Sequence, residues 1–191
     1  MTVENPYINT KLNVKCMLSP DDLNNEIYLN IKKKLEKNKE GRCFSNYGYI
    51  TKIHEITEYK NNLLHPENMT ASVLFNVTFS CQLCRPIKNQ MIICKVDKIN
   101  RMLLRLKNGP INVIVTNDRI NDQIFFSDNM GNLRYKKNDK SIELMPSDYV
   151  KITVINHRFN DGDRNILVIG YLEDIANDKE IEDYIKTNVT I

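Results

Sequence analysis

Glycine and tryptophan are scarce in this chain, and long apolar runs are missing. The 191 residues include six glycines and no tryptophan, and none of the glycine-rich patterns that cradle phosphates is present. No segment reaches the ~20 apolar residues of a membrane-spanning helix. The first residues lack the basic start and apolar run of a secretory signal, so we expect an intracellular protein.

Cysteine usage argues against a disulfide-bonded or metal-binding protein. The chain has an odd number of cysteines, which does not suit a disulfide framework: Cys16, Cys43, Cys81, Cys84 and Cys94. Cys81 and Cys84 form a lone C-x-x-C pair, whereas a structural zinc site needs four ligands. Residues i and i+3 of a strand face opposite sides of a sheet. We therefore interpret the cysteines as structural and expect no metal or other cofactor.

Groups that could perform catalysis are few. Of the three histidines, His157 precedes a turn and could act as a general base, but no nucleophile pattern accompanies it. Asp161-Gly-Asp163 lacks the distal Glu of a calcium-binding loop. We interpret Asn160–Gly162 as a hairpin turn and expect no enzymatic activity.

The overall charge is too small to indicate a nucleic-acid-binding protein. The formal net charge is +3, with 27% charged and 41% hydrophobic residues, which is typical of a globular protein with a core. The length allows one or two domains. Abundant Asn, Lys and Ile indicate an AT-rich genome, such as that of a protist or a large DNA virus.

The first part of the chain predicts one helix on a curved antiparallel sheet. Residues 12–18 alternate as a strand, and Ser19–Asp22 has the cap, proline and acid of a helix start. One buried stripe of this helix is formed by Leu23, Ile27, Ile31 and Leu35. Gly41 ends the helix. The helix also carries a group that we interpret as a solvated face: Lys32, Lys33, Lys34, Lys37 and Lys39.

Two further strands complete this unit. Residues 42–59 predict an extended segment that is broken at Asn46–Gly48 and contains a bulge. Residues 60–69 are polar and predict a loop. From Val73 a long strand alternates apolar and polar residues until Pro86 ends it.

The second part predicts a small closed barrel of the OB type. Five short strands are separated by turn signals: residues 92–96, 102–106, 111–115, 150–155 and 166–172. The long connection 116–148 is expected to form a helix or excursion, with a polar, mobile segment at 128–137. A short helix is expected at 179–185. We thus predict domains at 1–87 and 88–175, followed by a charged tail at 176–191.

Such barrels bind single strands through stacked aromatic rings and basic side chains. The candidates are Arg101, Arg105, Lys107, Arg119, Phe125, Phe126, Tyr135, Lys151, His157 and Arg158. For each aromatic ring the alternative is burial, and for each basic residue it is simple solvation. Phe125 and Phe126 are adjacent, so at most one is expected to be buried. Tyr135, between two basic residues, is the best stacking candidate.

The order of these parts resembles the larger stalk subunit of RNA polymerase, which is the seventh subunit of eukaryotic RNA polymerase II and has an archaeal counterpart. The resemblance runs from about residue 12 to about residue 174. It rests on Leu12–Pro20, Glu40–Ile50 with Cys43, Phe75–Phe79 with Arg85-Pro86, Asn108–Pro110 with Val113–Val115, and Ile169–Glu173. The family's Gly-aromatic pair after the first barrel strand is replaced here by Asn100–Arg105.

The resemblance implies a tip domain that docks on the polymerase core, an S1-type barrel that contacts nascent RNA, and a smaller helical partner subunit. It places core docking on Gly41, Gly48, Tyr49, Asn61, Asn62, Leu63, Leu64, His65 and Pro66. Together with the basic and aromatic candidates above, the resemblance predicts RNA binding by Arg101, Arg105, Lys107, Tyr135, Lys151, His157 and Arg158.

We therefore expect a non-catalytic stalk subunit of a DNA-directed RNA polymerase. The alternative is a free-standing S1-type RNA-binding protein of translation or RNA decay. A viral protein would work in the host cytoplasm, in a viral factory, and be packaged in the virion, whereas a cellular one would be nuclear.

Overall fold

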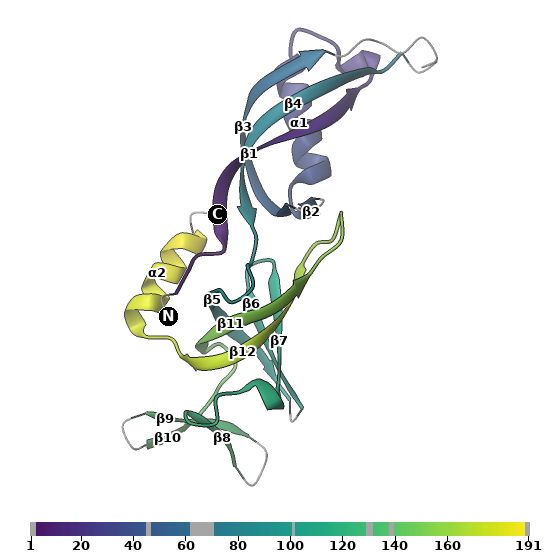
Figure 1. Ribbon diagram of the computed structural model, residues 1–191. Helices are drawn as coiled ribbons and strands as arrows, with labels where there is room; N and C mark the ends of the chain where they lie inside the picture. Colours follow the sequence, from purple (N-terminus) through teal and green to yellow (C-terminus); the bar gives the residue numbers. More distant parts are fainter. Residues whose placement is uncertain are drawn as a thin grey trace.

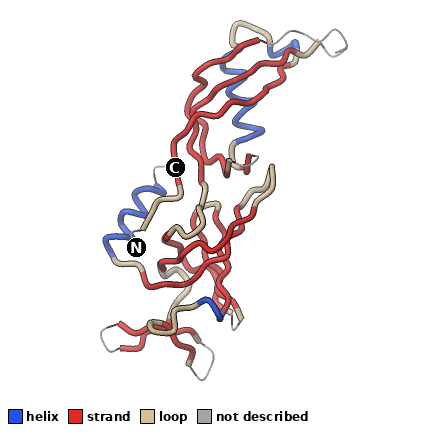
Figure 2. The backbone as a smooth tube through the Cα atoms, in the orientation of Figure 1, coloured by secondary structure: helices blue, strands red, loops and turns tan. Residues whose placement is uncertain are grey.

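The computed structural model describes residues 3–44, 47–61, 71–100, 102–128, 132–137 and 140–189. The molecule is elongated, with a sheet and a helix at one end, a barrel in the middle and a small sheet at the other end (Figure 1). Most of the regular structure is strand (Figure 2).

One helix lies on a four-stranded antiparallel sheet. The strands run in the order β1 (Tyr7–Leu18), β4 (Val73–Cys84), β3 (Gly48–Asn61) and β2 (Arg42–Phe44). The helix α1 (Ile27–Lys39) buries Ile31 and Leu35 against the sheet. Three register shifts interrupt the pairing of β3 with β4, which confirms the predicted bulged strand.

The helix begins later than the sequence predicts. Residues Pro20–Asp22 form only a short 3-10 turn, and α1 starts at Ile27. The Ser19 hydroxyl donates to the Asp22 carboxylate at 2.6 Å, so it does not cap a backbone N–H of a longer helix. Asn24 Oδ1 instead accepts a hydrogen bond from the Glu26 N–H at 2.9 Å. Its side chain therefore closes the turn that precedes the helix.

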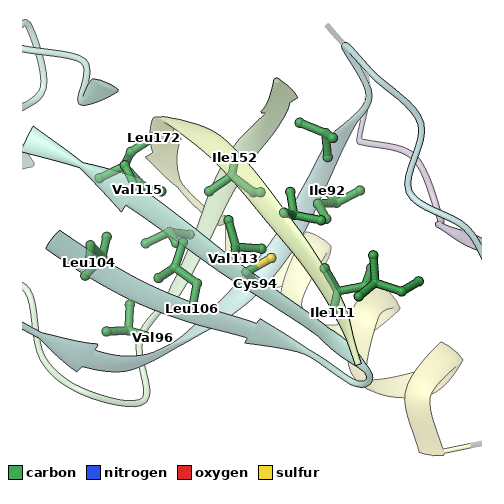
Figure 3. Packing of buried hydrophobic residues seen from close by; sticks show 14 of the residues in the cluster. Ile92, Cys94, Val96, Leu104, Leu106, Ile111, Val113, Val115, Ile152 and Leu172 are labelled. Carbon is green, nitrogen blue, oxygen red and sulfur yellow. The ribbon is translucent and has the colours of Figure 1, made fainter. Parts of the chain in front are cut away.

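The five strands predicted for the second part form a closed barrel, which is compatible with an OB-like fold. They are β5 (Met91–Ile99), β6 (Leu103–Asn108), β7 (Ile111–Thr116), β11 (Tyr149–Arg158) and β12 (Ile166–Ile175). The barrel closes through antiparallel β11–β5 and parallel β12–β7 pairs. Alternate side chains of each strand fill the interior (Figure 3).

The long connection contains a sheet that the sequence analysis did not predict. After a short turn, η2 (Asn117–Arg119), it forms β8 (Phe125–Ser127), β9 (Leu133–Lys137) and β10 (Lys140–Glu143). Phe125 and Leu133 are buried and join the core of the barrel. The segment 128–137, which was expected to be polar and mobile, includes the strand β9, whose Leu133 is buried.

The tail forms a helix that packs on the barrel. α2 (Asp178–Val189) is longer than the predicted 179–185, mainly at its C-terminal end, and Asp178 and Glu180 suit its first turn. Tyr184 contacts Tyr149 of β11 edge to face, with ring centroids 5.6 Å apart. α2 therefore extends the barrel's packing rather than standing free.

The first sheet and the barrel are joined by direct contacts. The Cys43 N–H of β2 donates to the Asp163 carbonyl oxygen at 2.7 Å, and the Gly162 N–H donates back to the Cys43 carbonyl oxygen at 2.9 Å. The predicted hairpin turn thus also bonds to the edge of the first sheet. As strand parity predicted, Cys81 lies in the core under α1 whereas Cys84 lies in the barrel cluster.

Candidate docking and nucleic-acid surfaces

Arg105 and Lys107 lie on the outer face of β6 and share one acid. Arg105 Nε is 3.2 Å from Asp97 Oδ2, and Lys107 Nζ is 3.1 Å from Asp97 Oδ1. Both basic side chains are nearly half exposed. The three groups together carry a net charge of about +1, so this cluster is a moderate site for one phosphate group.

Exposed aliphatic side chains lie next to these basic residues on the outer face of the barrel. Ile114 of β7 pairs with Arg105 on one side and with Ile169 of β12 on the other, while Leu167 pairs with Arg158 of β11. The exposed fractions are 38% for Ile114, 52% for Leu167 and 43% for Ile169. Basic residues thus flank an aliphatic band, which we call the barrel band and define as Arg105, Lys107, Ile114, Leu167, Ile169 and Arg158.

The apolar members of the barrel band were not among the residues predicted from the sequence. Strand alternation gave the signal, since Ile114 lies between Val113 and Val115 on the outward side. An aliphatic residue at an outward position of a small barrel faces solvent or a partner.

Lys151 lies apart from the barrel band and holds α2. Its side chain is 13% exposed, with Nζ 3.5 Å from Asp174 Oδ2 and 3.4 Å from Glu180 Oε2. These contacts give Lys151 a structural role, which is to hold α2 against the barrel.

His157 is half-buried near the end of β11. Its ring stacks on Phe159 at 6.0 Å, and burial, with a smaller effect of the Arg85 charge, lowers its pKa below the usual 6.5. The imidazole is therefore neutral at pH 7. A neutral ring stacked on Phe159 supplies no positive charge for a phosphate.

Tyr135 lies in the outer sheet rather than on the barrel strands. Its ring packs against Phe125 at 6.3 Å, and its hydroxyl pKa is raised by burial and by Asp148. Phe125 is buried whereas Phe126 is half-buried beside Lys136, which confirms the expectation for this adjacent pair. Arg119 pairs with Asp118 at 3.7 Å, and Arg101 lies outside the described residues.

The docking candidates fall into two separate groups. Gly41 and Gly48 have positive φ values of 75° and 135°, and Tyr49 packs half-buried against the barrel cluster. Gly48 itself is buried. Asn61 ends β3, and a strand of this length separates its ends by roughly 40 Å. The remaining candidates, Asn62, Leu63, Leu64, His65 and Pro66, lie outside the described residues.

The cysteines are buried thiols. Burial raises the pKa of Cys43 and Cys81 to about 11 and that of Cys84 to about 12, so all three are protonated at neutral pH. Within the described ranges, no group of three or more His, Cys, Asp or Glu side chains is placed to hold a metal ion. No helix in the described part of the chain is long and apolar enough to span a membrane.

Comparison with known proteins decides the family. The chain is 33% identical over 184 residues to the "Putative DNA-directed RNA polymerase subunit L376" of Acanthamoeba polyphaga mimivirus, covering 96% of this chain and 90% of that protein. The chain belongs to the RPB7 family of DNA-directed RNA polymerase subunits. No family model matches the chain.

Plant members of the RPB7 family are more distant. The RNA polymerase II subunit RPB7 of Glycine max is 28% identical over 146 residues, covering 76% of this chain and 80% of that protein. RNA polymerase II subunit 7 of Arabidopsis thaliana is 26% identical over 153 residues, covering 80% and 85%. The family resemblance expected from the sequence is therefore correct.

Proposed function

We propose that this RPB7-type subunit is a non-catalytic stalk subunit of a DNA-directed RNA polymerase. Its family membership carries the proposal, because relatives that match nearly the whole chain bear the name of polymerase subunits. Residues 1–87 form the docking domain in this proposal, 88–175 an S1-type barrel, and 176–191 a tail. A buried, protonated set of thiols and a neutral His157 offer no activated nucleophile.

Docking on the polymerase core is assigned to the end of the first domain that lies farthest from the barrel. The segment after Asn61 carries Leu63 and Leu64 between polar residues, and apolar residues in a polar loop suit a protein contact. Gly41, Gly48 and Tyr49 lie at the opposite end of β3 and contribute by holding β2 and β3 against the barrel. A smaller helical subunit then pairs along the length of the molecule.

RNA contact is assigned to the barrel band. Arg105, Lys107 and Arg158 supply charge for phosphates, and the exposed aliphatic residues between them supply a surface for bases. This arrangement replaces the aromatic stacking that the sequence lacks near Asn100. Contact of this kind is weak and depends on the backbone more than on base identity.

Replacing Arg105 and Lys107 by Gln tests the RNA assignment. The one phosphate contact of this cluster is lost, so the slope of log affinity against log salt for oligouridylate should fall by roughly 0.7. Fluorescence anisotropy at several salt concentrations measures the slope. The matched control is Lys11→Gln with Lys15→Gln, two exposed lysines of β1. An equal fall of the slope in both double variants would show that the barrel does not contact the RNA.

The whole proposal is tested by purifying the tagged protein from its native source and identifying the bound proteins by mass spectrometry. Large polymerase subunits together with one small helical protein are the expected result. Ribosomal or RNA-decay proteins without polymerase would instead assign the chain to the free-standing RNA-binding class.

The place of action follows from the source. The 33% identity to a mimivirus protein, against 28% and 26% for plant proteins, favours a viral polymerase. Such an enzyme works in the host cytoplasm and travels in the virion, whereas a cellular subunit would be nuclear.

A further inference from the structure

A row of lysines and amides on α1 lines a groove along one flank of the helix. The groove has a volume of about 300 Å³ and is lined by Asp22, Asn30, Lys33, Lys34, Lys37 and Asn38. The five residues from α1 follow a spacing of three and four, which places them along one face of the helix. Ile31 and Leu35 occupy the adjoining, buried face. We call this feature the α1 groove.

The α1 groove carries a net positive charge. Three lysines face a single acid, Asp22, whose carboxylate already accepts a hydrogen bond from Ser19 at 2.6 Å and lies 3.6 Å from Lys34. Lys33 and Lys37 are exposed and lie one helical turn apart. Residues at this spacing have Cβ atoms about 5–6 Å apart. The groove thus presents a short row of ammonium groups with an excess charge of about +2.

The other lysines of α1 point elsewhere, so this row is a distinct set. Lys32 donates to the His54 carbonyl oxygen at 3.0 Å, across to β3. Lys39 lies 4.4 Å from the centre of the Phe44 ring, beside β2. The lysines that the sequence analysis grouped as one solvated face therefore divide into two that contact the sheet and three that line the α1 groove.

The residues that line the α1 groove favour a nucleic acid over a protein as its partner. None of its lining residues is apolar or aromatic, whereas stable protein interfaces need apolar or aromatic anchors in a desolvated centre. Contacts to a phosphate backbone need only cations and N–H donors, and they carry no base specificity.

We infer that the α1 groove binds the phosphate backbone of a nucleic acid, as a second contact separate from the barrel band. It goes beyond the proposed RNA contact on the barrel, because α1 lies on the sheet at one end of the molecule, whereas the barrel lies in the middle (Figure 1). RNA and DNA share this backbone chemistry, and the experiment separates them.

The test compares Lys33→Gln, Lys34→Gln, Lys37→Gln with a matched triple variant, Lys11→Gln, Lys15→Gln, Lys52→Gln. The control lysines are exposed on the face of the same sheet that α1 does not cover. Both triples are placed in the full chain carrying Arg105→Gln and Lys107→Gln, so that the barrel band contributes equally. Thermal unfolding by circular dichroism checks that both remain folded. Binding is measured for oligouridylate, oligothymidylate of the same length, duplex DNA and polyglutamate.

Three lost contacts should weaken binding of oligouridylate on the order of tenfold and lower the salt slope by roughly 2, with no change in the control. An equal loss for oligothymidylate supports a backbone site indifferent to the sugar, a loss confined to RNA supports an RNA site, and one confined to the duplex supports a DNA site. Unchanged slopes for every nucleic acid would overturn the inference. So would polyglutamate binding tighter than oligouridylate, which would indicate an acidic protein partner.

Discussion

At Gly48 the backbone of β3 begins so close to β4 that no side chain fits. A Cβ at this position would lie 2.6 Å from the Cys84 carbonyl oxygen, and φ is 135°, a value that other residues rarely adopt. Replacing Gly48 by Ala should therefore lower the free energy of unfolding by about 3 kcal/mol, from the strained backbone together with the displaced strand. Urea denaturation followed by circular dichroism measures the loss.

Gly162 provides the control for Gly48. Its φ is also positive, at 83°, but nothing lies within 4 Å of the place where a Cβ would be. Gly162→Ala should cost only the backbone term, about 1 kcal/mol. Equal losses in the two variants would show that the contact with Cys84 does not matter.

His157 gives the stability of the protein a dependence on pH. Burial lowers its pKa in the folded state below 6.5, whereas the unfolded chain keeps the ordinary value of about 6.5. Below that pH the unfolded state binds more protons, so stability falls as the pH drops and is fully present above it. His157→Gln should remove this component.

Melting temperatures at about pH 7.5 and about pH 5.5, on either side of the ordinary histidine pKa, measure the effect. The fall between the two values should be smaller for His157→Gln than for the unaltered protein. His54→Gln, at an exposed histidine, is the control and should keep the full fall. If the two variants behave alike, His157 does not cause the dependence.

Individual side chains were predictable from the sequence where strand parity decides their direction. Cys81 and Cys84 face different cores because they are three residues apart on one strand. The same logic placed Phe125 inside and left Phe126 partly exposed. Parity could not reveal that Asp97 of β5 pairs with Arg105 and Lys107 of β6, because this depends on the register between strands.

At the scale of elements, Lys151 and Tyr149 of β11 both hold α2 against the barrel. Lys151 lies between Asp174 and Glu180, and Tyr149 packs on Tyr184. Lys151→Met keeps the apolar stem but removes the charge, which should weaken the docking of α2 by about 1 kcal/mol. Amide hydrogen exchange in α2 should then become roughly fivefold faster.

The same variant separates packing from RNA binding. Because Lys151 points to α2 and not to the barrel band, its replacement should leave the salt dependence of oligouridylate binding unchanged. Lys95→Met, at an exposed position of β5, is the control for α2 exchange. A reduced salt slope in Lys151→Met, with α2 exchange unaltered, would return Lys151 to the RNA-binding set.

Long alternating strands were predicted correctly, whereas the short strands of the connection and the start of α1 were not. The barrel strands repeat an apolar residue at every second position, and that period is unambiguous. The strands β8 and β10 have three and four residues, too few to establish a period. The start of α1 was misplaced because Ser19, Pro20 and Asp22 also suit a single 3-10 turn, and the competing hydrogen bonds of Asn24 are not visible in a pattern.

At the scale of the whole molecule, the first sheet and the barrel meet through residues distant in sequence. The Tyr7 hydroxyl lies 3.4 Å from Asn108 Oδ1, and β2 bonds to the turn after β11. The order of the parts followed from the sequence, but these contacts between them did not, because each joins segments whose approach depends on both folds being complete. Because these contacts hold the first sheet and the barrel together, the junction is poorly suited to binding another protein.

We therefore propose that the polymerase contact forms at the opposite end of β3, where it would not disturb the junction. Beyond Asn61 the sequence carries Leu63 and Leu64, and an apolar pair at the centre of an interface accounts for much of its binding energy. Leu63→Asp with Leu64→Asp should reduce co-purified polymerase by on the order of tenfold, because two buried charges replace the apolar contact. The melting temperature should not change.

Ile8→Asp with Ile87→Asp is the matched control, since both side chains are at least half exposed in the same domain, and Ile8 pairs with Leu83 at the other end of β4. This variant adds the same charge to the same domain but leaves the end of β3 intact, so polymerase should co-purify as with the unaltered protein. If both double variants lose the polymerase, the added charge is responsible. If neither does, the docking contact is not formed by the segment that follows β3, and the face of β2 and β3 around Tyr49 becomes the place to test next.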